Sequence, residues 1–112
     1  MQGSSKRPIC WLGNTREDLR LSEPEVRTNI GLQLLQVQQG FEPSNWKPMD
    51  NIAPGIREIR YTGPKHYRVI YVAKFEDCIY VLHFFEKKTQ KTPKLIIDAI
   101  KQRYKQILKG NI

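Results

Sequence analysis

The sequence of 112 residues contains only two cysteines, Cys10 and Cys78, and they match no metal-binding spacing. Two cysteines are also too few for the disulfide framework of a small secreted domain, so we interpret them as separate free thiols in a reducing cytosol. The N-terminus lacks the apolar core of a secretory signal, and no apolar run reaches the length of a membrane span. These absences predict a cytoplasmic protein with no membrane segment, no metal and no cofactor.

Motifs of several common nucleotide-binding and RNA-binding modules are also missing. The sequence has no P-loop and no glycine-rich dinucleotide fingerprint. Its apolar segments lack the Arg/Lys-Gly-Phe-like signature of an RNA-recognition module. It contains no internal repeat and no low-complexity tract. With ordinary apolar content at this length, the chain is expected to form a single domain over residues 1–112.

Acidic residues are scarce in the second half of the chain. Residues 1–56 carry six basic and six acidic residues, whereas residues 57–112 carry thirteen basic and five acidic, so the whole net charge of +8 lies in the second half. A neutral half joined to a basic half favours a surface for an anionic partner, with nucleic acid as the first candidate. A generally basic surface without a partner is the alternative, because no run of five like charges occurs.

The spacing of apolar residues predicts an α+β fold with helices packed on a small, mainly antiparallel sheet, in the order β-α-α-β-β-β-α. Tight turns between the last three strands indicate an antiparallel meander. The expected strands are Ile9–Leu12, Ile56–Tyr61, Tyr67–Ala73 and Ile79–Phe85. The expected helices are a brief one capped by Thr15, a long one over Glu23–Gln39 after a cap at Ser22, and a last one capped by Thr92 and ended by Gly110.

The long helix has the clearest pattern in the sequence. Apolar residues recur at spacings of four, four and three, which predicts a buried stripe of Val26, Ile30, Leu34 and Val37. The polar residues of the solvated side are expected to be Gln33, Gln36, Gln38 and Gln39. Gly40 stands where a helix commonly ends in a left-handed residue.

Two segments are expected to be irregular. Met1–Ser5 is expected to form a frayed tail. Phe41–Gly55 is predicted to be a long irregular connection, and its apolar residues Trp46, Met49 and Ile52 are expected to pack on the core rather than bind a ligand.

Candidate functional residues lie on the predicted meander, where alternate residues share a face. Glu58 and Arg60 share one face of their strand, and His83 is expected to share a face with Val81 and Phe85. One register would set Arg60, Arg68 and His83 on a single concave face, with Lys87 and Lys88 at the exit of the last strand. Arg68 is the most informative of these residues, because a charge in the middle of a strand is costly unless it meets an anion.

This group of residues suits the cleavage of RNA without a metal. The ribose 2′-OH attacks its own phosphate, so a site needs a proton acceptor, charge stabilisation and a proton donor. The forked donors of Arg60 and Arg68 match phosphate oxygens. Lysine titrates at about 10.4, so Lys87 or Lys88 would act as a base only if burial or neighbouring cations lowered its pKa, whereas His83 needs no such change.

Simpler interpretations exist for the same residues. Glu58 is expected to orient Arg60 or Arg68 rather than to take a proton. His83 could be a core residue of an aromatic strand, and the two lysines could form a solvated turn. Additional RNA contacts are expected from four other basic residues, namely Arg57, Lys65, Lys91 and Lys94.

Taken together, several short motifs resemble those of a known family, and the match spans nearly the whole chain. Leu82–Pro93 is specific by itself, and the order and spacing of the others support it. The other motifs are Trp11–Gly13, Val37–Gly40, Lys47–Met49, Gly55–Arg60 and Tyr67–Tyr71. The chain resembles the phage-derived branch of the RelE/HigB toxin superfamily, which comprises the toxins of bacterial type II toxin–antitoxin pairs.

This resemblance implies a RelE-like toxin that cleaves messenger RNA, commonly in the ribosomal A site, without metal or cofactor. A helix-turn-helix antitoxin would neutralise it and would provide its only link to DNA. The active surface implied for this chain comprises Arg60, Arg68, Lys87 and Lys88, with Glu58 and His83 in support. Some relatives use a histidine or aspartate near the C-terminus, and this chain has no histidine after His83.

Two other functions remain open at this point. A toxin of the same fold could block a protein target such as DNA gyrase, and a plain RNA-binding module could use the same basic surface. The combination of Arg68 with Lys87 and Lys88 favours the nuclease, since a protein blocker does not need paired cations beside a scissile phosphate.

Overall fold

Three antiparallel strands form the centre of the fold in the computed structural model, which describes residues 6–110. They are β3 (Ile56–Thr62), β4 (His66–Val72) and β5 (Ile79–Glu86), and they form the expected meander. β1 (Ile9–Trp11) pairs in parallel with β5, and β2 (Trp46–Pro48) pairs antiparallel with β3, which gives the order β1-β5-β4-β3-β2. The tail expected over Met1–Ser5 lies outside the described residues.

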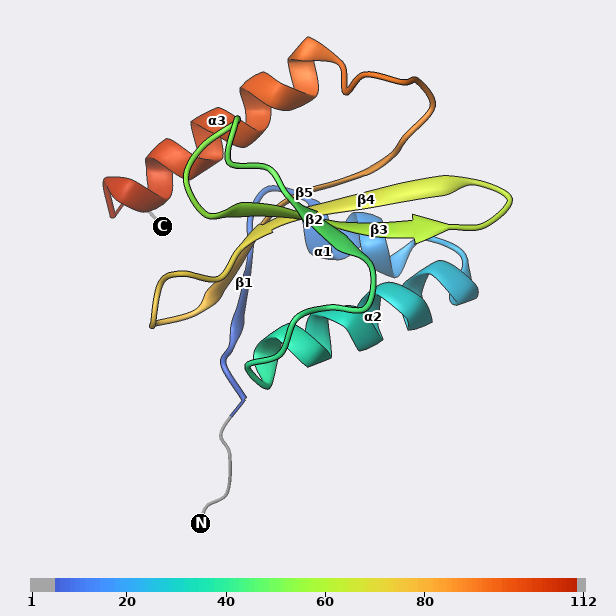
Figure 1. Cartoon of the computed structure of the whole chain (residues 1–112), viewed down its shortest axis with the longest axis horizontal. Helices are drawn as coiled ribbons and strands as arrows, with labels where there is room; N and C mark the ends of the chain where they lie inside the picture. Colours follow the sequence, from blue (N-terminus) through green and yellow to red (C-terminus); the bar gives the residue numbers. More distant parts are fainter. Residues whose placement is uncertain (1–5, 111–112) are drawn as a thin grey trace.

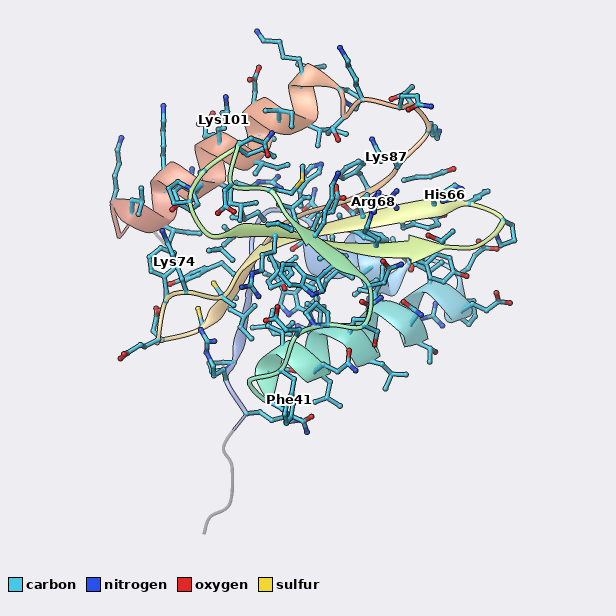
Figure 2. The ribbon with its side chains drawn as sticks, viewed as in Figure 1. Phe41, His66, Arg68, Lys74, Lys87 and Lys101 are labelled. Carbon is cyan, nitrogen blue, oxygen red and sulfur yellow. The ribbon has the colours of Figure 1, made fainter. Side chains whose placement is uncertain are left out.

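Helices cover both faces of this sheet, which confirms the α+β prediction (Figure 1). α1 (Thr15–Arg20) and α2 (Pro24–Gln38) precede β2 in the chain, and α3 (Lys94–Leu108) ends it. α2 packs on one face and α3 on the other. Within the described residues no helix is long and apolar enough to cross a membrane. β4 begins at His66, beside the hairpin that joins it to β3 (Figure 2).

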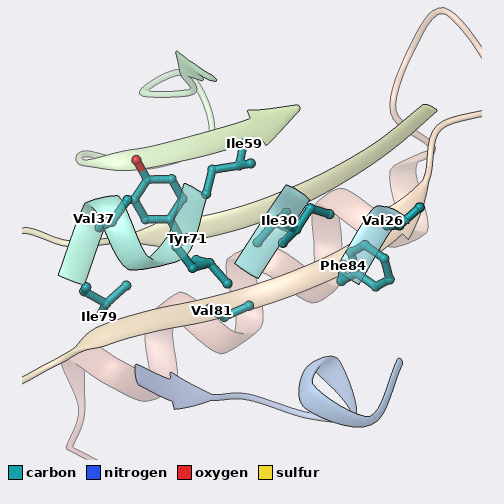
Figure 3. Close-up of a cluster of buried hydrophobic side chains, with 10 residues drawn as sticks. Val26, Ile30, Val37, Ile59, Tyr71, Ile79, Val81 and Phe84 are labelled. Atoms are coloured by element: carbon teal, nitrogen blue, oxygen red, sulfur yellow. The ribbon is translucent and has the colours of Figure 1, made fainter. Parts of the chain in front are cut away.

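The core between α2 and the sheet confirms the predicted helix stripe. Val26, Ile30, Leu34 and Val37 are all buried, and they pack with Ile59, Tyr71, Val81 and Phe84 from the three central strands (Figure 3). Fully burying an aliphatic or aromatic side chain of this size contributes roughly 1.5–3 kcal/mol. Gly40 has φ 91°, so it supplies the left-handed conformation expected after this helix.

The core between α3 and the sheet contains Ile100 and Tyr104, which pack with Ile70, Leu82 and Phe85. The Tyr104 hydroxyl donates a hydrogen bond of 2.8 Å to the carbonyl oxygen of Pro54. This bond ties the loop before β3 to α3. The partly buried side chains packed against this core include Met49 and Ile52. This packing confirms the expectation for those two residues.

The segment Phe41–Gly55 is not wholly irregular as predicted, because it contains β2. β2 is a three-residue edge strand that ends in Pro48. Proline is tolerated at a sheet edge, where its missing N–H breaks no ladder. The strand forms because β3 offers it an unpaired edge, and a three-residue segment shows no apolar alternation by which to recognise it.

All three predicted helix caps are wrong. Thr15 is the first residue of α1 and its side chain is buried, so Asn14 occupies the cap position. The Ser22 hydroxyl donates instead to the Leu19 carbonyl oxygen at 2.6 Å, and Glu23 precedes α2. Pro93 occupies the cap position of α3, one residue after Thr92. In each case the helix is anchored by tertiary packing, which outweighs a local cap.

The prediction that Gln33 lies on the solvated side of α2 is also wrong, because this residue is only 3% exposed. Its amide nitrogen donates to Asn29 Oδ1 at 2.8 Å and to the Arg60 carbonyl oxygen at 3.3 Å. Its amide oxygen accepts a bond of 2.8 Å from the Asn45 backbone nitrogen. Gln33 therefore joins α2 to β3 and to the chain that leads into β2, a role that requires it to be buried.

The two cysteines are free thiols, as expected, but they are neighbours rather than separate. Parallel pairing places Cys10 opposite Tyr80, two residues beyond Cys78. Burial raises the pKa of the Cys10 thiol, and the adjacent Cys78 raises it further. A raised thiol pKa reduces the reactive thiolate fraction.

A β-bulge in β5 overturns the predicted sorting of its side chains. Ile70 lies opposite His83 while Tyr71 lies opposite Val81, so Leu82 has no partner on β4. Val81 and Phe84 consequently pack in the α2 core, whereas Leu82 and Phe85 pack in the α3 core. Strict alternation grouped His83 with Val81 and Phe85. The grouping with Val81 is wrong because the bulge lies between the two residues, whereas His83 does share a face with Phe85, with ring centroids 5.7 Å apart.

Arg103 of α3 binds the bulge. Its Nη1 atom donates to the Leu82 carbonyl oxygen at 2.6 Å and lies 2.9 Å from His83 Nδ1. Burial lowers the pKa of His83, and Arg103 lowers it further, while Asp18 acts in the opposite direction. The neutral imidazole is therefore the form that fits the folded protein.

This lowered pKa predicts that the free energy of unfolding falls as the pH drops below about 6.5, since the unfolded chain then binds a proton that the folded chain resists. The loss ends once the pH is below the pKa of folded His83. Thermal unfolding of wild type and His83→Gln between pH 8 and pH 5 measures the effect. The variant, whose side-chain amide oxygen can still accept from Arg103, should show a weaker dependence on pH. Equal slopes for wild type and His83→Gln would contradict this assignment.

Candidate functional site

Basic side chains converge on an open groove where β3, β4 and the exit of β5 meet. The groove has a volume of about 420 Å³. Figure 2 shows His66, Arg68 and Lys87 together beside the β3–β4 hairpin, below the loop that leads to α3. We call this hollow the cationic groove, and its lining residues are Arg60, His66, Arg68, Lys87, Lys88, Thr89 and Gln90.

The register of the sheet brings the two predicted arginines together. Arg60 of β3 lies directly opposite Arg68 of β4, so both side chains emerge on the same face. Like charges directly opposite each other are destabilising in a sheet. Glu58 offsets this repulsion, because its Oε1 atom lies 3.5 Å from Arg60 Nε and 3.6 Å from Arg68 Nε.

Glu58 is held away from solvent, with only 2% of its surface exposed. Its contacts with the two arginines are longer than a well-formed hydrogen bond, so it acts mainly through charge. Two positive charges share one negative charge, and the cluster keeps an excess of +1. The role predicted for Glu58, which is to orient the arginines rather than to take a proton, stays a prediction.

Arg68 is the most buried cation of the groove, at 6% exposure. Its Nη1 atom donates to the Tyr67 carbonyl oxygen at 3.0 Å. Burial lowers the pKa of the guanidinium, Glu58 opposes this, and Arg60 adds to the lowering. An arginine remains charged in proteins, so the lowered pKa means that the charge is only partly compensated. An anion in the groove would complete its compensation.

Lys87 and Lys88 follow β5 and form what we call the lysine corner. The lysine corner is fixed to β4 through the backbone. The Lys87 backbone nitrogen donates to the His66 carbonyl oxygen at 2.7 Å, and Lys87 Nζ donates to the Gln90 carbonyl oxygen at 2.9 Å. Burial lowers the pKa of Lys87. Arg68, Lys47 and Arg60 lower it further, against the effect of Glu58. Lys88 is exposed beside it.

The sequence did not point to two basic residues that lie in or beside the groove. His66 lies two residues before Arg68 on β4, so strand alternation alone could have placed it on the same face. Lys47 lies opposite Glu58 and lowers the pKa of Lys87. No signal pointed to Lys47, because its position depends on β2.

Two other candidates lie away from the groove. His83 is half-buried against Arg103 and is not among the lining residues. Arg57 lies opposite Tyr71, which faces the α2 core, and so projects from the other face of the sheet. It forms an ion pair of 2.9 Å with Glu42 and stacks on the Trp46 ring at 4.4 Å.

The predicted RNA-binding lysines are also outside the groove. Lys65 is exposed in the β3–β4 turn, and Lys91 is exposed in the loop before α3. Lys94 begins α3 and lies 4.0 Å from Asp98. None of these three side chains lines the groove.

Cations dominate the chemistry that this site offers. Across residues 6–110, no group of three or more histidine, cysteine, aspartate or glutamate side chains is arranged to hold a metal ion. The groove presents arginine, lysine and histidine donors to its occupant, and the nearby carboxylate of Glu58 is already paired. Donors of this kind are suited to binding a phosphate group and to stabilising additional negative charge on it.

Comparison with known proteins gives one positive result. A model of the family described as "Phage derived protein Gp49-like (DUF891)" matches residues 17–105. No curated protein and no solved structure matches the chain. The matched segment contains α2, the strands of the cationic groove, the lysine corner and most of α3. The chain therefore belongs to the Gp49-like family of phage-derived proteins.

Proposed function

We propose that the protein is the toxin of a toxin–antitoxin pair and that it cleaves messenger RNA in the cationic groove without a metal ion. The observation that carries this proposal is the pair of opposed arginines, Arg60 and Arg68, held by the single buried carboxylate of Glu58. Family membership supports a toxin, and the resemblance to RelE/HigB toxins supports the ribosomal A site as the place of cleavage. A helix-turn-helix antitoxin would be its inhibitor.

The reaction needs no group beyond those of the RNA and the groove. The ribose 2′-oxygen forms a bond to the adjacent phosphorus, and the bond from phosphorus to the 5′-oxygen breaks. The products are a 2′,3′-cyclic phosphate and a 5′-hydroxyl end. Negative charge increases on the phosphate oxygens in the transition state, where the guanidinium groups of Arg60 and Arg68 stabilise it.

Two groups of the groove serve the proton transfers in this proposal. Lys87 accepts the proton of the 2′-OH, because burial and the nearby cations lower the pKa of its amine and so increase the neutral fraction. His66 lines the same groove and donates a proton to the departing 5′-oxygen. Glu58 takes no part in proton transfer, since it is buried between the arginines.

Replacing Arg68 by alanine should reduce cleavage about 100-fold or more, since this is the usual effect of losing one preorganised charge-stabilising donor. Arg68→Lys keeps the positive charge but loses the forked pair of guanidinium donors, so it should retain part of the activity. Cleavage of a defined RNA and growth arrest upon expression measure the effect, and circular dichroism checks the fold. Full toxicity from a folded Arg68→Ala protein would refute the site. Toxicity with DNA damage signalling but without RNA cleavage would indicate a gyrase-type target.

The proposed base predicts a specific pH dependence. Lys87 must be neutral to accept a proton and the proton donor must still carry one, so the cleavage rate should rise with pH to a maximum and then fall. Because burial and nearby cations lower the pKa of Lys87, this maximum should lie below the value of about 10.4 that is usual for lysine. The rate profile of Lys87→Ala should lose this rise, whereas that of Lys88→Ala should keep it. An unchanged profile in Lys87→Ala would assign the base elsewhere.

A further inference from the structure

The outer face of α3 forms a second cationic surface, separate from the groove. Its apolar face is buried against the sheet, so the opposite face points to solvent. Figure 2 shows Lys101 on this helix, away from Arg68 and Lys87. The outer face encloses a shallow hollow of about 490 Å³. We call this surface the α3 ridge, and its residues are Asp98, Lys101, Gln102, Lys105, Gln106 and Lys109.

Within residues 6–110 none of the three ridge lysines forms an ion pair, and the carboxylate of Asp98 lies 4.0 Å from Lys94. Lys101, Lys105 and Lys109 follow each other at intervals of four residues, and residues 99–110 contain no aspartate or glutamate. Like charges four residues apart destabilise a helix by about 0.2–0.5 kcal/mol per pair. The helix dipole favours cations in the last turn, which accounts for Lys105 and Lys109 but gives no support to Lys101 in the middle of the helix.

The composition of the ridge disfavours two kinds of partner. Protein–protein interfaces are depleted in lysine and enriched in aromatic residues, methionine and arginine, and the ridge has the opposite composition. A membrane-surface helix needs a free apolar face, but the apolar residues Ile100 and Tyr104 are buried against the sheet.

A nucleic-acid backbone fits the ridge better. Four helical residues rise about 6 Å, so the three lysines form an evenly spaced row about 12 Å long. Lysine binds phosphate as a point charge, and the neighbouring amides of Gln102 and Gln106 can both donate and accept hydrogen bonds with phosphate or ribose 2′-OH groups. Such contacts recognise the shape and charge of an RNA duplex rather than its sequence.

We propose that the α3 ridge binds the phosphate backbone of a structured RNA, separate from the strand that occupies the cationic groove. This inference rests on the proposed function, in which the protein acts on RNA. The ridge anchors the protein on folded RNA, and the groove cleaves a single strand.

Neutralising the ridge tests this inference with the full chain. The variant Lys101→Gln/Lys105→Gln removes two charges and keeps similar helix propensity, so the fold should be retained. Its matched control is Lys6→Gln/Arg16→Gln, which removes two exposed charges outside the ridge. The probe is an RNA hairpin with a stem of about 20 base pairs, titrated at several salt concentrations. The slope of log affinity against log salt should become shallower by about 1.4–1.8 in the ridge variant, and should change less in the control.

Cleavage of a short single-stranded RNA separates the ridge from the groove. The ridge variant should cleave it at the wild-type rate, whereas Arg68→Ala should lose cleavage and keep the wild-type salt slope on the hairpin. Equal slopes in the ridge variant and wild type would overturn the ridge and leave the nuclease proposal intact. Polyglutamate, titrated in the same way, serves as a second probe that represents an acidic protein. If the ridge variant binds polyglutamate more weakly but binds the hairpin as wild type does, the partner is an acidic protein and the RNA assignment is wrong. A wild-type protein that binds the hairpin through the ridge but cleaves no RNA would overturn the nuclease proposal alone.

Discussion

The buried carboxylate of Glu58 is the constraint on which the cationic groove depends. Without it, Arg60 and Arg68 would face each other across two strands with no compensating charge, and Arg68 would be almost fully buried as an isolated cation. An uncompensated buried charge costs several kcal/mol. One carboxylate between two guanidinium groups keeps the sheet stable, yet it neutralises only half of their charge. The fold thus tolerates the arginines and leaves them able to bind an anion.

The bulge in β5 determines which side of the sheet receives the lysine corner. With strict alternation from Val81, which faces α2, residue 87 would also project toward α2. The extra residue at Leu82 shifts the pattern, so that Phe84 faces α2 and Phe85 faces α3. Continued alternation then directs Lys87 to the side of Arg68, where it lines the groove. Arg103 stabilises the bulge through the Leu82 carbonyl oxygen, so a contact at one end of α3 supports the geometry of the site.

The sequence predicted the features that follow from regular periodicity. The meander, the buried stripe of α2 and the shared face of Glu58 and Arg60 all come from patterns of period two or 3.6. The bulge could not be predicted, because one added residue breaks the period without leaving a sequence signal. β2, and with it Lys47, depends on pairing with β3 rather than on its own three residues. His66 could have been predicted, since it lies two residues before Arg68 on the same strand and alternation places both on one face.

The charge asymmetry of the chain becomes an asymmetry of the folded molecule. Some cations of the second half have partners elsewhere in the fold: Arg57 forms an ion pair with Glu42 on the α2 side, and Lys74 donates to the Tyr104 hydroxyl at 2.7 Å. Within residues 6–110, the lysines of the groove and of the α3 ridge form no ion pair, and only Arg60 and Arg68 contact a carboxylate, that of Glu58. Both surfaces come from residues 57–110, which carry the whole excess charge. Each of these positively charged surfaces attracts a polyanion over roughly a Debye length, about 8 Å at physiological salt. Two such surfaces therefore favour a partner that carries phosphate groups along an extended path. A small anionic ligand would need only the groove.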